Sequence, residues 1–156
     1  MTVPAPFVLL GADGLPHDLA GQTGHPLLLV FFKTTCSTCR MTFPYLERFY
    51  QAYRAYGFQV WGISQDPLDA SLAFAVDGGA TFPIVLDTNW DVSQTYEVEG
   101  VPTFVLVDSA GQVAYRCASF SKEDLNEMSR LVASETHSAW VEIAPANDGK
   151  PAFRPG

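Results

Sequence analysis

The spacing of apolar residues changes along the chain and predicts alternating strands and helices. The run LLLVFF, residues 27–32, is continuously apolar, as is typical of a strand buried on both faces. In residues 37–57, apolar side chains recur at three- and four-residue spacing up to a glycine, which predicts a long amphipathic helix. The segment FQVWGIS, residues 58–64, is predicted to be a second buried strand.

The rest of the chain continues this alternation. An edge hairpin is predicted near the start, and then come a helix, a short strand, a short helix, two strands joined by a turn, and a last helix that Ser121 caps. The hairpin is expected at residues 6–19, the helix at 66–79 and the short strand at 82–87. The short helix is expected at residues 90–98, the two strands at 102–117 and the last helix at 121–134. Asp66 is expected to be the N-cap of the helix that follows it.

Together these elements predict an α/β fold with a mixed central sheet and helices on both faces. We expect one domain over residues 1–134. Residues 135–156 are expected to form an irregular tail, and its last part, residues 144–156, is rich in proline and glycine and is expected to lie on the surface or to fray.

Composition restricts the classes of function. The chain has 156 residues, 47% of them hydrophobic, and a formal net charge of −8 without a cluster of basic residues. Such a chain is repelled by nucleic acids and anionic lipid surfaces, so neither a nucleic acid nor a membrane is expected as a partner. The first residues lack the pattern of a secretory leader, which predicts a cytoplasmic location, or an extracytoplasmic one if a leader has been removed.

Cys36 and Cys39 are the candidate reactive groups. They follow a buried strand and lie at the start of the predicted long helix, where residues three apart share one face. Free N–H groups at a helix start favour a thiolate, which is the form of cysteine that attacks a disulfide. We expect Cys36 to be the nucleophile and Cys39 the resolving thiol.

Two other interpretations of the cysteine pair remain open: half of a metal site, or two inert buried thiols. Zinc needs four ligands, and no second close pair of cysteines or histidines is present, so no metal is expected. Cys117 lies at the end of a predicted strand and is expected to be a small core residue.

The strand, the C-x-x-C, Pro44 within the helix and the segment GVPTFVLVDSAGQV, residues 100–113, resemble the thioredoxin-like family. The resemblance is closer to its TlpA/ResA branch of thiol-disulfide oxidoreductases, within the AhpC/TSA-like superfamily. It covers about residues 5–134, and the segment between VWGISQD and FPIVLD is similar to the insertion of that branch. The resemblance implies a thioredoxin-like fold with an N-terminal hairpin and an inserted βα segment, and no cofactor.

The resemblance also implies a substrate-binding region. Pro102 matches the family's cis-proline, which leaves the Val101 backbone free to pair with an extended segment of a substrate. Thr35, Ser37 and Thr38 surround the cysteines and are predicted to contact the substrate as well.

The sequence departs from the family pattern at two positions. Thr35 replaces an aromatic residue before the first cysteine, and Val30 replaces the buried acid of thioredoxins proper. Glu47 is a weak candidate for that acid, and a solvated position on the helix is the simpler interpretation. Lys33 is interpreted as a surface lysine, and Trp90 and Phe82 are candidates for lining the substrate surface.

The leading hypothesis is a monomeric oxidoreductase that reduces disulfides in protein substrates and is recharged by an unidentified thiol reductant. A thiol-dependent peroxidase with antioxidant activity is the second hypothesis. The peroxiredoxin pattern, however, places proline and threonine where this chain has Leu29 and Lys33. The third hypothesis is a thioredoxin-fold binding module without catalysis.

Overall fold

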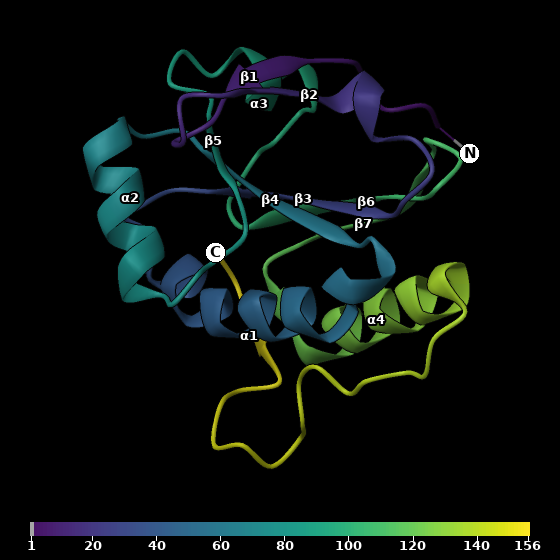
Figure 1. The fold of residues 1–156 in the computed structure, drawn as a ribbon. Coiled ribbons are helices and arrows are strands. Elements are labelled where there is room, and N and C mark those ends of the chain that lie inside the picture. The colour runs from purple at the N-terminus through teal and green to yellow at the C-terminus, as the bar shows by residue number, and fades with distance from the viewer. Residues whose placement is uncertain (1) are drawn as a thin grey trace.

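A five-stranded mixed sheet forms the centre of the computed structural model, which describes residues 2–156 (Figure 1). Its strand order is β5-β4-β3-β6-β7. These strands are β3 (Leu27–Phe32), β4 (Gln59–Ser64), β5 (Ile84–Leu86), β6 (Thr103–Val107) and β7 (Val113–Ala118). β3, β4 and β5 are parallel, and β6 runs antiparallel to both β3 and β7, so the predicted mixed sheet is confirmed.

Helices cover both faces of the sheet, as predicted. Figure 1 shows α1 and α4 below the sheet, and the N-terminal hairpin and α3 above it. The helices are α1 (Ser37–Tyr53), α2 (Leu68–Asp77), α3 (Asp91–Thr95) and α4 (Lys122–Thr136), with short 3-10 turns η1 (Leu19–Gln22) and η2 (Arg54–Tyr56). The hairpin consists of β1 (Val8–Leu10) and β2 (Pro16–Asp18).

β3 explains why the sequence has an unbroken apolar run. All six of its residues are buried, and alternate side chains enter two separate clusters. Leu28, Val30 and Phe32 pack with residues of α1 and α4, whereas Leu27, Leu29 and Phe31 pack toward the hairpin and α3. Because successive strand residues point to opposite faces, a central strand covered on both sides must be apolar at every position.

The N-cap predicted from the sequence is confirmed for α4 and is wrong for α2. Ser121 caps α4 as predicted, since its side chain accepts a hydrogen bond from the Asp124 amide. The prediction for Asp66 is wrong, because α2 begins at Leu68 with Pro67 as its N-cap. The Asp66 carboxylate instead binds Thr34 in the loop after β3.

The tail after α4 packs against the helices. Ile143 is fully buried and Ala144 is 2% exposed, so the expectation that residues 144–156 lie on the surface is wrong at Ala144. The Asn126 side chain of α4 accepts from both of their amides and donates to the Ala144 carbonyl, each at 2.9 Å. The domain boundary at residue 134 stays a prediction.

A buried lysine holds the next part of the tail. Lys122 is only 6% exposed, and its ammonium group donates to the Asp148 carboxylate at 2.6 Å and to the carbonyls of Pro145 and Lys150. This ammonium group and the hydroxyl of Tyr45 hold the pKa of Asp148 well below its usual range. All three groups that accept hydrogen bonds from the Lys122 ammonium group belong to the tail. The tail therefore provides the partners that this buried positive charge of α4 needs.

The end of the tail adds a second, short ladder. β8 (Phe120–Ser121) pairs antiparallel with β9 (Phe153–Arg154). Figure 1 shows the yellow tail passing below α1 and α4 before its end rises toward the start of α1.

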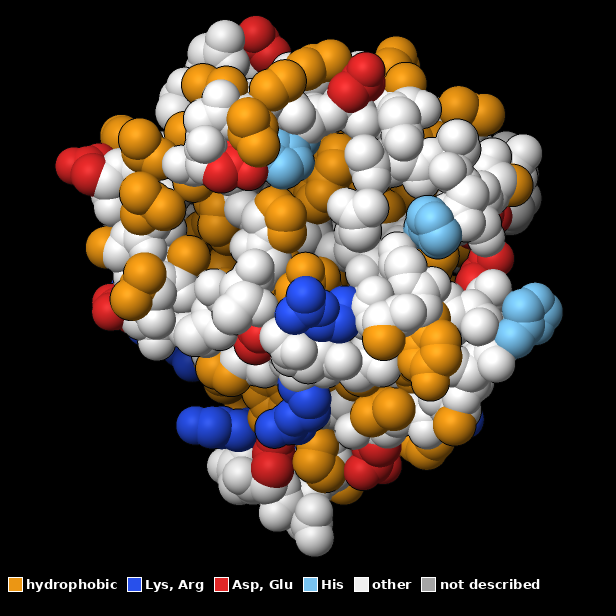
Figure 2. Space-filling model, viewed as in Figure 1, with side chains coloured by type: hydrophobic (Ala, Val, Ile, Leu, Met, Phe, Trp, Pro, Cys, Tyr) orange, Lys and Arg blue, Asp and Glu red, His pale blue; other side chains and the backbone are white. Residues whose placement is uncertain are grey.

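The surface carries exposed apolar side chains over α2 (Figure 2). Leu68, Leu72 and Val76 of this helix are 45%, 43% and 76% exposed, whereas Phe74 on its other side is buried. Within residues 2–156, no helix combines the length and hydropathy that crossing a membrane requires.

Replacing Asn126 with alanine is expected to lower the free energy of unfolding by about 2 kcal/mol, because three tail hydrogen bonds are lost and two amides lose their acceptor. Urea unfolding measures the change. Asn147→Ala is the matched control, since Asn147 is exposed on the same tail, and it should shift stability by less than about 0.5 kcal/mol. Equal effects of the two substitutions would contradict this account of the tail.

Candidate active site

The register of the sheet brings the cysteine loop beside the proline loop. β3 pairs with β6 so that Phe31 lies opposite Thr103, which places the end of β3 next to the start of β6. The loop after β3 carries Cys36, and the loop before β6 carries Val101 and Pro102. The Val101–Pro102 peptide bond is cis, and the Cys36 thiol lies 3.6 Å from the Val101 carbonyl oxygen, to which it donates.

Asp66 fixes the loop that leads to Cys36. Its carboxylate accepts from the Thr34 amide at 2.6 Å and from the Thr34 hydroxyl at 2.8 Å. The Cys36 amide in turn donates to the Lys33 carbonyl. Asp66 follows β4, the neighbour of β3, so two parallel strands cooperate in setting the backbone before the helix.

Cys36 is the N-cap residue of α1. Its sulfur accepts a hydrogen bond from the Cys39 amide at 3.0 Å, in the position where serine or aspartate oxygen usually lies. An amide aimed at the sulfur, together with the partial positive charge of the helix start, stabilises negative charge on that sulfur. Cys36 is also partly exposed, so a second molecule can reach it.

Cys39 has the opposite environment. It is fully buried one turn into α1, and this burial, followed by the hydrogen bond with Cys36, raises its pKa well above the usual thiol value. Both cysteines are free, so the structure holds the dithiol form. Disulfide exchange requires this arrangement: a partly exposed sulfur that accepts a hydrogen bond from an amide, beside a buried thiol that stays protonated.

The described residues place no carboxylate in hydrogen-bond contact with either sulfur. Val30 is fully buried within an apolar cluster. Glu47 instead accepts from the amide and hydroxyl of Thr81 on the exposed side of α1, which gives it a structural role.

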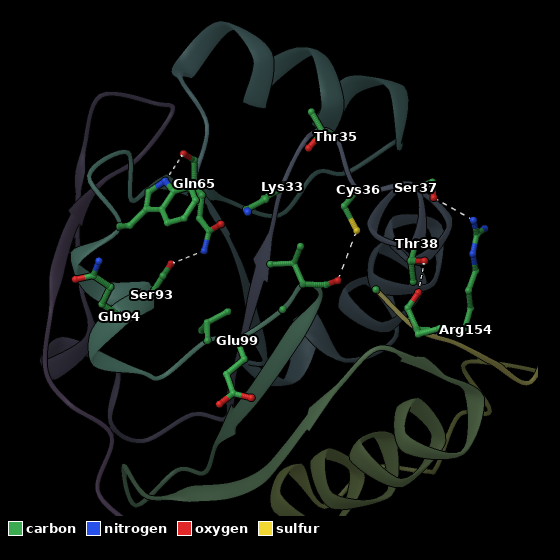
Figure 3. A pocket seen from close by; sticks show the side chains of 16 residues that line it. Lys33, Thr35, Cys36, Ser37, Thr38, Gln65, Ser93, Gln94, Glu99 and Arg154 are labelled. Carbon is green, nitrogen blue, oxygen red and sulfur yellow. Dashed lines mark hydrogen bonds between the residues drawn. The ribbon is translucent and has the colours of Figure 1, made fainter.

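A cleft of about 530 Å³ opens beside Cys36 (Figure 3). On one wall, the Lys33 ammonium group lies 4.5 Å from the centre of the Trp90 ring. Trp90 therefore lines the cleft, as was considered from the sequence, whereas Phe82 is only 3% exposed and belongs to the core.

Gln65 lies behind the same wall and was not singled out from the sequence. Its amide nitrogen donates to the Ser93 hydroxyl, which itself donates to Asp87, so the amide orientation is fixed. Its Oε1 atom is buried and has no hydrogen-bond partner. A glutamine after a strand carries no sequence signal that would have identified this position.

The five predicted substrate-contacting residues are brought together, but not all are open. Thr35 and Ser37 are exposed at the cleft, and Val101 is partly exposed. Pro102 is buried, and Thr38 is only 3% exposed because the tail lies over it. Arg154, Pro155 and Gly156 line the cleft as well, although nothing in their sequence pattern predicted it.

Cys117 lies in β7, away from the cleft. It packs against the main core cluster, and burial followed by the nearby Asp124 carboxylate raises its pKa to about 12. Within the described part of the chain, no three histidine, cysteine, aspartate or glutamate side chains lie close enough to hold a metal ion.

The two positions that matter for peroxide chemistry hold unsuitable side chains. Leu29 is fully buried in the core, and Lys33 lies against Trp90 in the cleft. Neither offers the shielding proline or the hydroxyl donor of the peroxiredoxin pattern.

Comparison with known proteins assigns this chain to a family. The model of the AhpC/TSA family matches residues 2–116. The thiol-disulfide oxidoreductase ResA of Geobacillus kaustophilus is 32% identical over 121 residues, which are 76% of this chain and 70% of that protein. ResA of Bacillus subtilis is 30% identical over 108 residues, covering 69% of this chain and 60% of that protein.

Solved structures agree with the fold. A putative thiol:disulfide interchange protein DsbE from Chlorobium tepidum superposes with a TM-score of 0.80 at 26% identity, covering 86% of this chain and 96% of that one. A secreted Mycobacterium tuberculosis disulfide oxidoreductase superposes with a TM-score of 0.71 at 25% identity, covering 82% and 95%. The thioredoxin-like fold expected from the sequence is confirmed.

Iodoacetamide at pH 7 is expected to label Cys36 in the folded dithiol protein and to leave Cys39 unmodified, because burial keeps Cys39 protonated. Since the thiolate fraction grows with pH below the pKa, labelling of Cys39 should rise about tenfold per pH unit above pH 7. Peptide mapping by mass spectrometry measures both sites. Cys36→Ser should remove the fast phase, and equal labelling of both cysteines at pH 7 would contradict the assignment.

Proposed function

Because this chain belongs to the AhpC/TSA family and is a thiol-disulfide oxidoreductase of the ResA type, we propose that Cys36 and Cys39 are its catalytic dithiol and that it reduces disulfides in protein substrates. One observation carries this assignment: the partly exposed sulfur of Cys36 accepts a hydrogen bond from the Cys39 amide at the start of α1, while the Cys39 thiol is buried one turn behind it.

The reaction proceeds in two exchanges. The Cys36 thiolate attacks one sulfur of the substrate disulfide, which forms a mixed disulfide and releases the other substrate sulfur as a thiolate. Cys39 then loses its proton and attacks the Cys36 sulfur, and the second substrate sulfur leaves and takes up a proton. Two electrons pass to the substrate, and the protein is left with a Cys36–Cys39 disulfide that a thiol reductant must reduce.

The loop before β6 orients the substrate. The Val101 carbonyl already points at the Cys36 sulfur, so an extended substrate segment that pairs with the Val101 backbone places its disulfide within reach of attack. Pro102 lines this position without offering an N–H group. Thr35 and Ser37 contact the substrate from the cysteine loop.

Proton transfer from Cys39 is the demanding step. Formation of the mixed disulfide removes the negative charge from Cys36, which relieves the charge repulsion that helps to raise the pKa of Cys39. Position 30 is valine and no carboxylate among the described residues contacts either sulfur, so we assign water as the proton acceptor, which must reach Cys39 during the exchange.

The direction of electron flow follows from the compartment. We place the protein in the cytoplasm as a monomer, where thiol reductants keep such a couple reduced and it serves as a reductant. Some of the similar proteins are described otherwise: the Mycobacterium tuberculosis homologue is a secreted protein. A location outside the cytoplasm would favour a different electron donor and leave the two exchange steps unchanged.

Cys36→Ser is expected to abolish reduction of insulin by the protein with dithiothreitol as donor, a loss of at least about a hundredfold, because the attacking sulfur is gone. Cys39→Ala should instead accumulate a mixed disulfide on Cys36, visible as an added mass that dithiothreitol removes. Cys117→Ser is the matched control and should retain normal turnover. Insulin reduction by the wild-type protein no faster than by dithiothreitol alone would support the binding module instead.

A peroxidase would behave differently in the same variants. Hydrogen peroxide consumption with a supplied thiol should be negligible in the wild-type protein. Fast consumption that survives Cys39→Ser would overturn the proposal in favour of the peroxidase.

The reduction potential of the Cys36–Cys39 couple is expected near about −270 mV, the value typical of a thioredoxin-like reductant. Equilibration with glutathione buffers, followed by alkylation and mass spectrometry, measures it. A value near about −120 mV would mean that the protein oxidises its substrates, and the cytoplasmic assignment would then be wrong.

A further inference from the structure

The segment Phe153–Gly156 lies against the residues that are proposed to receive the substrate. The guanidinium group of Arg154 donates to the Ser37 hydroxyl at 3.0 Å, and the Thr38 hydroxyl donates to the Pro155 carbonyl at 2.8 Å (Figure 3). Gly156 approaches the Val101 carbonyl so closely that a Cβ atom added there would collide with that oxygen.

These contacts use three of the five predicted substrate-contacting residues, Ser37, Thr38 and Val101. An extended polypeptide that pairs with the Val101 backbone would need the space that Gly156 fills. Substrate and segment therefore exclude each other at this edge of the cleft, although the Cys36 sulfur itself stays partly exposed.

The segment is attached much more weakly than the tail that precedes it. Residues 143–150 are fixed by the buried Ile143 side chain and by the hydrogen bonds of Asn126 and Lys122. Residues 153–156 are all exposed and are held by a two-residue ladder and two side-chain hydrogen bonds. Segments with exposed hydrogen bonds and few buried contacts open locally without unfolding of the rest.

We infer that Phe153–Gly156 is an internal competitor that occupies the peptide-docking groove beside Cys36 and that a protein substrate must displace. The inference rests on the proposed function, since it takes Val101 as the position where the substrate pairs. The apparent affinity for a protein substrate is then the intrinsic affinity reduced by the fraction of molecules in which the segment is open.

The segment also indicates what the groove accepts. In this segment the basic side chain of Arg154 contacts Ser37, and the small residue Gly156 lies against the Val101 carbonyl. The cleft lining beside the segment carries one basic side chain, Lys33, and one acidic side chain, Glu99. The net charge of −8 on the whole protein favours a basic partner. The substrates that compete best are extended segments with a basic residue close to the reactive disulfide.

Removal of residues 153–156 tests the competition. The variant should reduce insulin with a KM at least about threefold lower than the full chain, while its rate with Ellman's reagent, a small disulfide that needs no groove, should change by less than twofold. A free peptide of the sequence AFRPG should inhibit the shortened variant and inhibit the full chain far less. Lys150→Ala, on the exposed part of the anchored tail, is the matched control and should leave both rates unchanged.

Arg154→Ala in the full chain keeps the test independent of the deletion, because it only removes the contact with Ser37. This substitution should also lower the KM for insulin, by a smaller factor than the deletion of residues 153–156 does. An unchanged or higher KM in both variants would overturn the inference and would mean that the segment is neutral or helps to bind substrate. Failure of Ellman's reagent to react with Cys36 in the full chain and in the shortened variant alike would instead reject the proposed function.

Discussion

The pairing of β3 with β6 is the constraint on which the site depends. It fixes the end of a strand that is buried on both faces against the start of its antiparallel neighbour, so the loop that carries Cys36 and the loop that carries Val101 and Pro102 meet at one edge of the sheet. The apolar run of β3 holds this edge in place because its side chains enter both core clusters. The hydrogen bonds of Asp66 then remove the freedom that remains in the cysteine loop.

The two sulfurs obtain different properties from a single helix turn. The Cys36 sulfur is partly exposed and accepts the Cys39 amide, whereas the Cys39 thiol is fully buried. No carboxylate among the described residues contacts the pair, so the difference comes from backbone dipoles and burial. Because of this difference, Cys36 can attack the substrate disulfide and Cys39 can resolve the mixed disulfide without further catalytic side chains.

The sequence predicted those parts of the fold that depend on periodicity. The buried strand, the long helix, the hairpin at residues 108–111 and the cap at Ser121 all follow from local patterns that the tertiary structure retains. The tail could not be predicted in this way. Its contacts are made by backbone carbonyls and by isolated polar side chains such as Asn126 and Lys122, whose partners lie 17 to 28 residues away and leave no periodic signal. The same reason explains why Gln65 and Arg154 were missed, and why Asp66 was mistaken for a cap.

The role of Cys36 as the cap of α1 links the helix to the redox state. A sulfur in a disulfide accepts a hydrogen bond from an amide more weakly than a thiolate does, so oxidation weakens the first turn and reduction restores it. Loss of an N-cap costs a helix about 1 kcal/mol. For a two-electron couple this corresponds to about 20 mV, in the direction that stabilises the dithiol and makes the protein a slightly weaker reductant. The helix start that makes Cys36 reactive therefore also limits how strongly it can donate electrons.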